Sequence, residues 1–443
     1  MILERIYNLA NEDVQDRNFI SNYLPFRNKG NEFDYSAVSG NLISLLMRKR
    51  ISKKYDFDRF QDDCIAEVSS YLSDPGFKTQ ISEMYFKDKF ITNVSLEFSL
   101  FNTQENSSAG SRHLFDIFKS MLCKGEGSGH TDIKGDMNFI EKIFLDVLNT
   151  HLEPFEHQQD CKPYLPFLAN FFHEDLIFLC QYPEYFLSEN KRFLCLYSFL
   201  YCSQLALNIN EFQKEPSSKP LYFILDTEKA SQERLQIKDN GYAWLQENIG
   251  DLFPVLSLLE YFNRGEQGVK IMPLWSFGLA LLAANKDEIQ LANQSLELFL
   301  ERFINSRKLD ENYEKKVDPL DTLKTLIDCA KGQFMKETGN TRWEVHENYK
   351  RQFSDHIARH FIQRRGRSGN VLTLNQDNLL LLTNLVIGSK ESLRFQELLK
   401  SFRARGIWFD KQSEQVLIKF YERIGNVVKM SDSGDAVYVC KTL

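Results

Sequence analysis

The hydrophobic period changes from about 3.6 residues to 2 near the C-terminus, and this change constrains the fold more than any other feature. Three segments with helical spacing come first, at 375–386, 391–404 and 411–424. Two short apolar runs follow, Val427–Met430 and Val437–Cys440, with the letters SDSGDA between them. Serine, aspartate and glycine are the residues that tight turns require. Three helices followed by a two-stranded hairpin are the element order of a winged helix-turn-helix domain.

Start and stop signals delimit these three predicted helices. Asn375 can cap the first helix, and Gly388 lies just past its end. Gly406 follows the second helix, and Asp410 can cap the third. On the third helix the polar Lys411, Gln415 and Lys419 oppose an apolar stripe made of Val416, Leu417, Phe420, Tyr421 and Ile424. The third helix should therefore bury one face and expose the other.

Basic residues gather around this predicted domain. From Arg342 to the C-terminus there are 17 Lys and Arg against 11 Asp and Glu, out of 54 and 61 in the whole chain, so residues 1–341 are acidic. The run RRGRSG (364–369) combines arginine forks with glycines, which suits close approach to a phosphate backbone. A recognition helix would place its side chains in a major groove. The candidate nucleic-acid-binding residues are Arg364, Arg365, Arg367, Arg403, Arg405, Lys411, Gln412, Gln415 and Lys419. Many winged helices dock proteins instead, so contact with duplex DNA and contact with protein alone remain alternatives.

The residues before this domain are predicted to be mainly helical. The stretches IEKIFLDVL (140–148) and LANQSLELFLERFI (291–304) place their apolar residues on one helical face. The chain is therefore expected to be mainly α and multi-domain, with a helical body and a C-terminal winged helix-turn-helix domain. We expect an N-terminal mixed α/β module at 1–105, the helical body at 106–341 and the basic winged-helix domain at 342–443.

Membrane insertion and secretion are not indicated. The apolar stretch 193–209 falls short of the roughly 20 residues that a bilayer core needs, and it contains Ser, Gln and Asn. We expect it to be a buried core helix. The eight cysteines include no CxxC pair, which favours reduced thiols. Met1, Ile2 and Leu3 are followed at once by Glu4 and Arg5, unlike a cleavable signal. A soluble cytoplasmic protein without membrane contact is expected.

Catalytic motifs are weak. The run KGEGSGHT (124–131) lacks the Gly-Lys-[Ser/Thr] ending of a phosphate-binding loop, because His130 stands where the lysine is needed. Asp226 and Glu228 end the best strand candidate of the body and could belong to a metal-dependent nuclease. Such a core needs an acid-x-Lys triplet on a second strand, whereas these acids crowd one turn. We expect no catalytic residue, metal site or cofactor, and keep the divergent nuclease centred on Asp226 and Glu228 as an alternative.

Three C-terminal segments resemble the DptG family, also called DndG: RRGRSGNVLTLN (364–375), RGIWFD (405–410) and ERIGNVVKMSDSGDAVYV (422–439). Weaker similarity lies in YLPFRNKGNEFD (23–34) and LYFILDTEKASQER (221–234), so the resemblance covers nearly the whole chain. It implies a non-catalytic subunit of a bacterial defence complex that restricts DNA lacking phosphorothioate. The implied partners are DptF-like and DptH-like subunits, which would carry the ATP-driven and nuclease steps. The family brings no catalytic motif that maps onto this chain.

Overall fold

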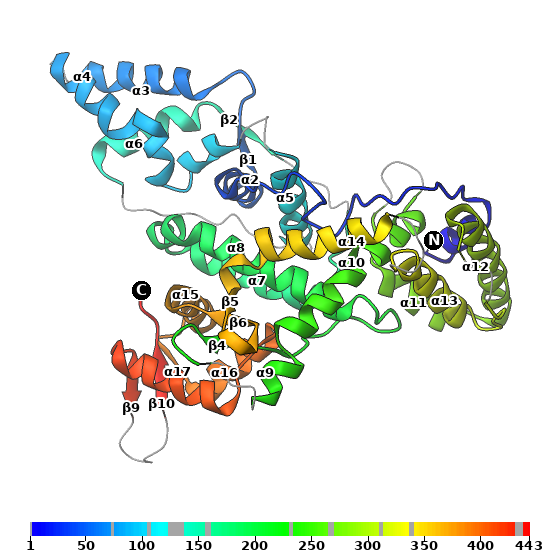
Figure 1. Ribbon diagram of the computed structural model, residues 1–443. Helices are drawn as coiled ribbons and strands as arrows, with labels where there is room; N and C mark the ends of the chain where they lie inside the picture. Colours follow the sequence, from blue (N-terminus) through cyan, green and yellow to red (C-terminus); the bar gives the residue numbers. More distant parts are fainter. Residues whose placement is uncertain are drawn as a thin grey trace.

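The structure is a computed structural model that describes ten segments of the chain: residues 2–71, 75–103, 108–122, 137–155, 161–229, 234–264, 270–309, 313–335, 341–429 and 437–443. Both the glycine-rich run at 124–131 and the predicted hairpin tip at 431–436 lie outside the described residues. Within the described residues the fold is mainly helical, as predicted (Figure 1).

The N-terminal part contains a small lobe with its own hydrophobic core. Buried aromatic side chains dominate this core, among them Phe60, Phe86, Phe98 and Phe144. The strands β1 and β2 pair antiparallel at the base of the lobe, with Arg50 opposite Glu153. The elements of this part are α1 (Ile2–Asn8), η1 (Leu9–Asn11), α2 (Tyr35–Met47), β1 (Lys49–Ile51), α3 (Phe57–Tyr71), α4 (Pro75–Ile81), η2 (Ser82–Phe86), η3 (Lys87–Asn93), η4 (Phe98–Asn102), α5 (Ala109–Leu122), α6 (Phe139–Asn149) and β2 (Leu152–Pro154).

Residues 12–34 form a strap without helix or strand that connects α1 to α2 across the molecule (Figure 1). Side chains from distant helices supply hydrogen bonds to its main chain, which would otherwise lack partners. The Glu260 carboxylate accepts from the main-chain N–H groups of Ser21 and Asn22, at 2.6 and 2.8 Å. Guanidinium groups far along the chain donate to strap carbonyls from four positions, Arg264, Arg302, Arg307 and Arg342. The strap is therefore fixed by residues far along the chain.

Helices also make up the body. Its elements are α7 (Pro166–Cys180), α8 (Pro183–Asn208), β3 (Leu221–Tyr222), β4 (Ile224–Leu225), α9 (Leu235–Asp239), α10 (Tyr242–Phe262), α11 (Leu274–Leu282), α12 (Lys286–Arg307), α13 (Pro319–Gly332), α14 (Arg342–Gln352), η6 (Phe353–Ile357) and η7 (Arg359–Phe361). In α12 a capping box joins Asn285 and Glu288, and the predicted apolar face is buried. The predicted amphipathic helix within 291–304 is therefore confirmed.

The apolar stretch 193–209 forms the buried second half of α8, as predicted. Its polar residues bind the main chain of a neighbouring loop. Gln204 accepts from the Lys219 N–H at 2.8 Å and donates to the Lys219 carbonyl at 3.0 Å. Among the described residues, no helix is long and apolar enough to cross a membrane.

The C-terminal residues contain the three predicted helices, but the second begins at Phe395 and not at Glu391, because Ser392–Arg394 form a strand. The elements are β5 (Ile362–Arg364), η8 (Gly366–Ser368), β6 (Asn370–Leu374), α15 (Gln376–Ile387), β7 (Ser392–Arg394), α16 (Phe395–Ala404), β8 (Ile407–Trp408), α17 (Lys411–Arg423), β9 (Val427–Lys429) and β10 (Val437–Cys440). Asn375 and Asp410 are N-caps, as predicted. The strands β9 and β10 pair antiparallel, and β7 joins the other side of β10 to give the order β7-β10-β9.

Two strands of the C-terminal part pair with strands of the body. The strand β6 lies parallel to β4, and β8 lies parallel to β3. Gly406 precedes β8 with φ +90, which other residues rarely adopt, and a Cβ there would lie 2.2 Å from the Gln204 amide nitrogen, so a side chain would force Gln204 to move. The largest hydrophobic cluster runs from Ile6 to Val439. The boundaries predicted after residues 105 and 341 remain predictions, but the main core spans both of them.

A buried ion pair joins the C-terminal part to the body. Arg405 follows α16 and donates from Nη2 to Asp175 Oδ1 on α7 at 2.7 Å. The two side chains are only 6% and 3% exposed, and the Tyr197 hydroxyl donates to the same carboxylate. Burial alone would lower the pKa of Arg405, but the charge of Asp175 and the contacts with Asp175 and Tyr197 together outweigh it and raise that pKa.

We expect Asp175→Ala to destabilise the protein by about 3–5 kcal/mol, because it leaves a buried guanidinium without a counter-charge. Glu153→Ala is the control. It removes an exposed partner of Arg50, 3.7 Å away, and should cost less than about 1 kcal/mol. Urea unfolding followed by circular dichroism measures both values. Equal losses in the two variants would contradict the role given to the buried pair, and Asp175→Leu with Arg405→Met should regain most of the stability.

Candidate nucleic-acid interface

The helix α17 has one buried face and one outward face. Ser413, Leu417, Phe420 and Tyr421 point into the protein, and the Tyr421 hydroxyl lies 2.6 Å from Thr383 Oγ1 on α15. The exposed residues of α17 form what we call the outward face: Lys411, Gln412, Gln415, Lys419, Glu422 and Arg423. Four of the nine candidate nucleic-acid-binding residues therefore lie together on this face. It carries three cations and one acid.

Arg403 lies beside the outward face without belonging to α17. Its guanidinium donates to Glu414 Oε1 at 2.7 Å and lies 5.2 Å from the centre of the Trp408 ring. Lys411 donates to the other oxygen of the same carboxylate at 2.9 Å. Glu414 thus connects two of the predicted cations.

Arg405 is a correction to the predicted set. It is two residues from Arg403, but its guanidinium points into the core and binds Asp175. Because the side chain is buried and its charge is matched internally, it cannot contact a DNA backbone. The prediction that Arg405 lies on a nucleic-acid surface was wrong.

The basic run RRGRSG forms the turn of the β5–β6 hairpin. Gly366 and Gly369 both have positive φ, which glycine adopts without strain. Arg364 is exposed, whereas Arg365 folds back and donates to the Asp226 carbonyl and to Gln363 Oε1. The side chain of Arg367 lies outside the described residues. Of this run, Arg364 is the described arginine that is available to a ligand.

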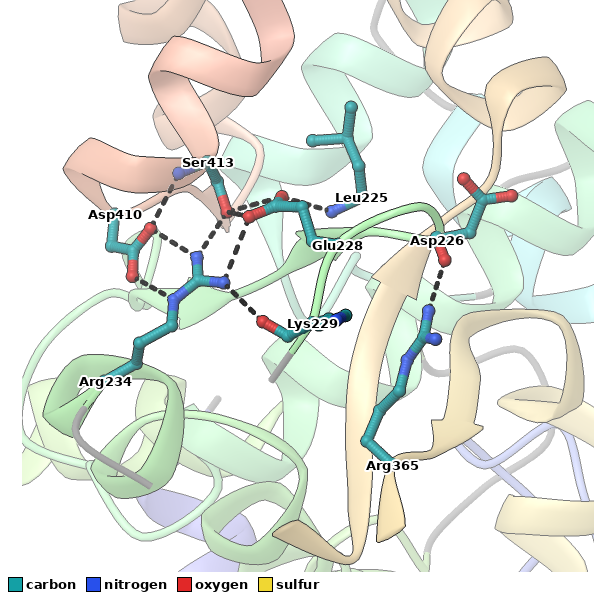
Figure 2. A network of polar contacts seen from close by, with 8 residues as sticks. All are labelled: Leu225, Asp226, Glu228, Lys229, Arg234, Arg365, Asp410 and Ser413. Atoms are coloured by element: carbon teal, nitrogen blue, oxygen red, sulfur yellow. Dashed lines mark hydrogen bonds and ion pairs between the residues drawn. The ribbon is translucent and has the colours of Figure 1, made fainter. Parts of the chain in front are cut away.

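A polar network fixes the N-terminus of α17 against the body (Figure 2). Arg234 binds Glu228 at 3.0 Å and Asp410 at 2.6 Å. The Ser413 hydroxyl donates to Glu228 Oε1 at 2.8 Å. The loop after β4 therefore touches α17 at Glu228 and the β5–β6 hairpin at Asp226, through the contact with Arg365 (Figure 2). The same loop therefore holds both basic segments, α17 and the β5–β6 turn, although these are distant in sequence.

The charges of this network stabilise each other. Burial alone would raise the pKa of Asp410, but hydrogen bonds from Arg234 and from the Ser413 main chain outweigh it and lower that pKa below its ordinary value. Burial alone would lower the pKa of Arg234, but its bond to Asp410 and the charge of Glu228 raise it. Both groups therefore remain charged at neutral pH.

The geometry does not favour a nuclease centred on Asp226 and Glu228. The Glu228 carboxylate already accepts from Arg234, from Ser413 and from the Leu225 N–H, so a metal ion would have to displace these donors. The Asp226 carboxylate points away from Glu228 (Figure 2). Within the described segments, no three His, Cys, Asp or Glu side chains are grouped as they would need to be to hold a metal ion.

Sequence reasoning missed one residue of the outward face and one residue of the buried network behind it. Arg423 occupies the outward face four residues after Lys419, and counting one more helical turn from Lys419 would have found it. Arg234 stands in the quoted run LYFILDTEKASQER, but its partner Asp410 is 176 residues away. No local signal identifies such a partner.

When the chain is compared with known proteins, no family model matches it and no curated protein matches it.

We expect Asp410→Asn to weaken the protein at pH 7 by about 1–3 kcal/mol, because asparagine keeps the helix cap but loses the ion pair with Arg234. The pKa of Asp410 is lowered by folding, so its contribution is present above the unfolded pKa of about 3.9 and is lost as pH falls through the lowered value. The difference from wild type should shrink in urea unfolding at about pH 3. Asp377→Asn, at an exposed pair with Arg192, is the control. A difference that is unchanged at low pH would contradict the assignment.

Proposed function

We propose that this chain is a non-catalytic DNA-binding and scaffold subunit of a bacterial restriction complex that acts on DNA lacking phosphorothioate modification. The C-terminal helices and hairpin form a winged helix-turn-helix domain that contacts duplex DNA, and the acidic helical body docks the partner subunits. One observation carries the DNA-binding part of the proposal: the outward face of α17 presents Lys411, Gln412, Gln415, Lys419 and Arg423 to solvent.

The order of the elements supports the winged-helix assignment. A strand, β7, lies between α15 and α16, and the hairpin β9–β10 follows α17. The three strands form one antiparallel sheet with β10 in the centre. In this arrangement α16 and α17 correspond to the helix-turn-helix pair, and α17 takes the place of the recognition helix.

The chemistry of the outward face suits a duplex. Glutamine can donate to and accept from an adenine edge in the major groove, and lysine and arginine bind backbone phosphates. Gln412 and Gln415 lie in the first half of α17, where recognition helices reach base edges. Lys419 and Arg423 lie in the second half, where phosphate contact is the natural role.

The resemblance to the DptG family supplies the biological setting. It supports assembly with DptF-like and DptH-like subunits in the cytoplasm, and it assigns the ATP-driven and nuclease steps to those partners. The setting and the partners rest on the resemblance, and the DNA contact rests on the geometry of α17.

We expect the full-length chain to bind a random-sequence duplex, with an affinity that falls steeply as salt rises. Lys419→Glu combined with Arg423→Glu should weaken binding at least 10-fold and make the salt slope shallower by about two, because two phosphate contacts are lost. Fluorescence anisotropy across a salt series measures both quantities. The matched control is Lys78→Glu with Lys87→Glu, which makes the same charge change on exposed residues of the small lobe.

Equal weakening by both double variants would mean that net charge, and not α17, determines binding. If the intact chain does not bind DNA even at low salt, the winged helix would instead be a protein-docking module. Running the same series with phosphorothioate-modified duplex tests whether this chain or a partner senses the sulfur.

A further inference from the structure

Glu414 lies between two cations at the edge of the outward face. Its two oxygens accept from Arg403 at 2.7 Å and from Lys411 at 2.9 Å. The Glu414 side chain is 8% exposed, whereas that of Lys411 is 87% exposed. One covered carboxylate therefore binds two cations that would otherwise face a bound duplex, and it offsets one of their two positive charges.

The two ion pairs can be exchanged for contacts with phosphate. Lys411 is almost fully exposed, so water and salt screen its attraction to Glu414. A backbone phosphate offers the same kind of anionic oxygen, and it binds arginine at least as well as a carboxylate does. The Arg403 guanidinium also stacks on Trp408, so it keeps its position when the carboxylate is neutralised.

We infer that Glu414 is an internal competitor of DNA, and this inference rests on the proposed DNA-binding function. The carboxylate holds Arg403 and Lys411 in ion pairs that open when these side chains bind backbone phosphates. The cost of opening them lowers the affinity of α17 for a duplex. Glu414 thereby keeps the contact weak and reversible, and Lys419 and Arg423, which are not paired with Glu414, supply the basal binding.

The test compares Glu414→Gln with wild type in the full-length chain, using anisotropy on a random-sequence duplex across salt. Glutamine has nearly the same shape and still accepts from Arg403, but it carries no charge. We expect binding to tighten by roughly 3- to 10-fold at about 0.1 M salt, and the salt slope to steepen by one to two because one or two further phosphates are engaged. The control, Glu397→Gln, removes one acid from the exposed side of α16 and should change the affinity less than about twofold.

The outcomes separate this inference from the proposed function. If neither wild type nor any variant binds DNA, the proposed function is wrong, and the inference about Glu414 is wrong as well. A second case is that wild type binds DNA and the Lys419/Arg423 double variant does not. If Glu414→Gln then binds no tighter than Glu397→Gln, only the inference about Glu414 is wrong. Weaker binding by Glu414→Gln would also overturn it, because Glu414 would then position the cations for DNA. If circular dichroism shows that Glu414→Gln does not fold, Glu414→Met takes its place, because methionine fills the covered site. This variant must then tighten DNA binding by the same factor.

Discussion

An arginine keeps its positive charge at every pH at which proteins work, so a buried one is destabilising unless an acid or other hydrogen-bond acceptors lie beside it. This chain brings an acid to a buried arginine at two of the places where its C-terminal part meets the body. Arg405 meets Asp175 behind the helix-turn-helix pair, and Arg234 meets Glu228 and Asp410 at the start of α17. Together with the pairings β3–β8 and β4–β6, these contacts hold α17 in one orientation. The body therefore determines the direction in which the outward face points.

Much of the fold was predictable because its signals are local. Asn375, Asp410 and Gly406 occupy the cap positions that their chemistry favours, and the apolar stripe of α17 is buried where helical spacing put it. The change of period near Val427 likewise corresponds to a pair of strands. Each of these features depends on residues within one or two turns, so the linear sequence contains the information.

The remaining features depend on distant partners. Arg403 and Arg405 look alike in sequence, yet one lies at the surface and the other is buried, because Asp175 reaches only the second from 230 residues away. The sequence made Glu228 a candidate metal ligand, but its carboxylate oxygens are bound by Arg234 and Ser413. The sequence therefore predicted which side of α17 faces outward, whereas the roles of individual charges needed the tertiary contacts.

The strap at 12–34 has a consequence for the way the protein is made. Its anchors include Glu260, Arg302, Arg307 and Arg342, so the strap gains these partners only after much of the chain that follows it has been made. Contacts of such high sequence separation slow folding and leave early segments exposed meanwhile. The small lobe at the N-terminal end closes its own core with contacts that span fewer than one hundred residues. Co-translational folding should thus start in that lobe, and the strap should be among the last parts to settle.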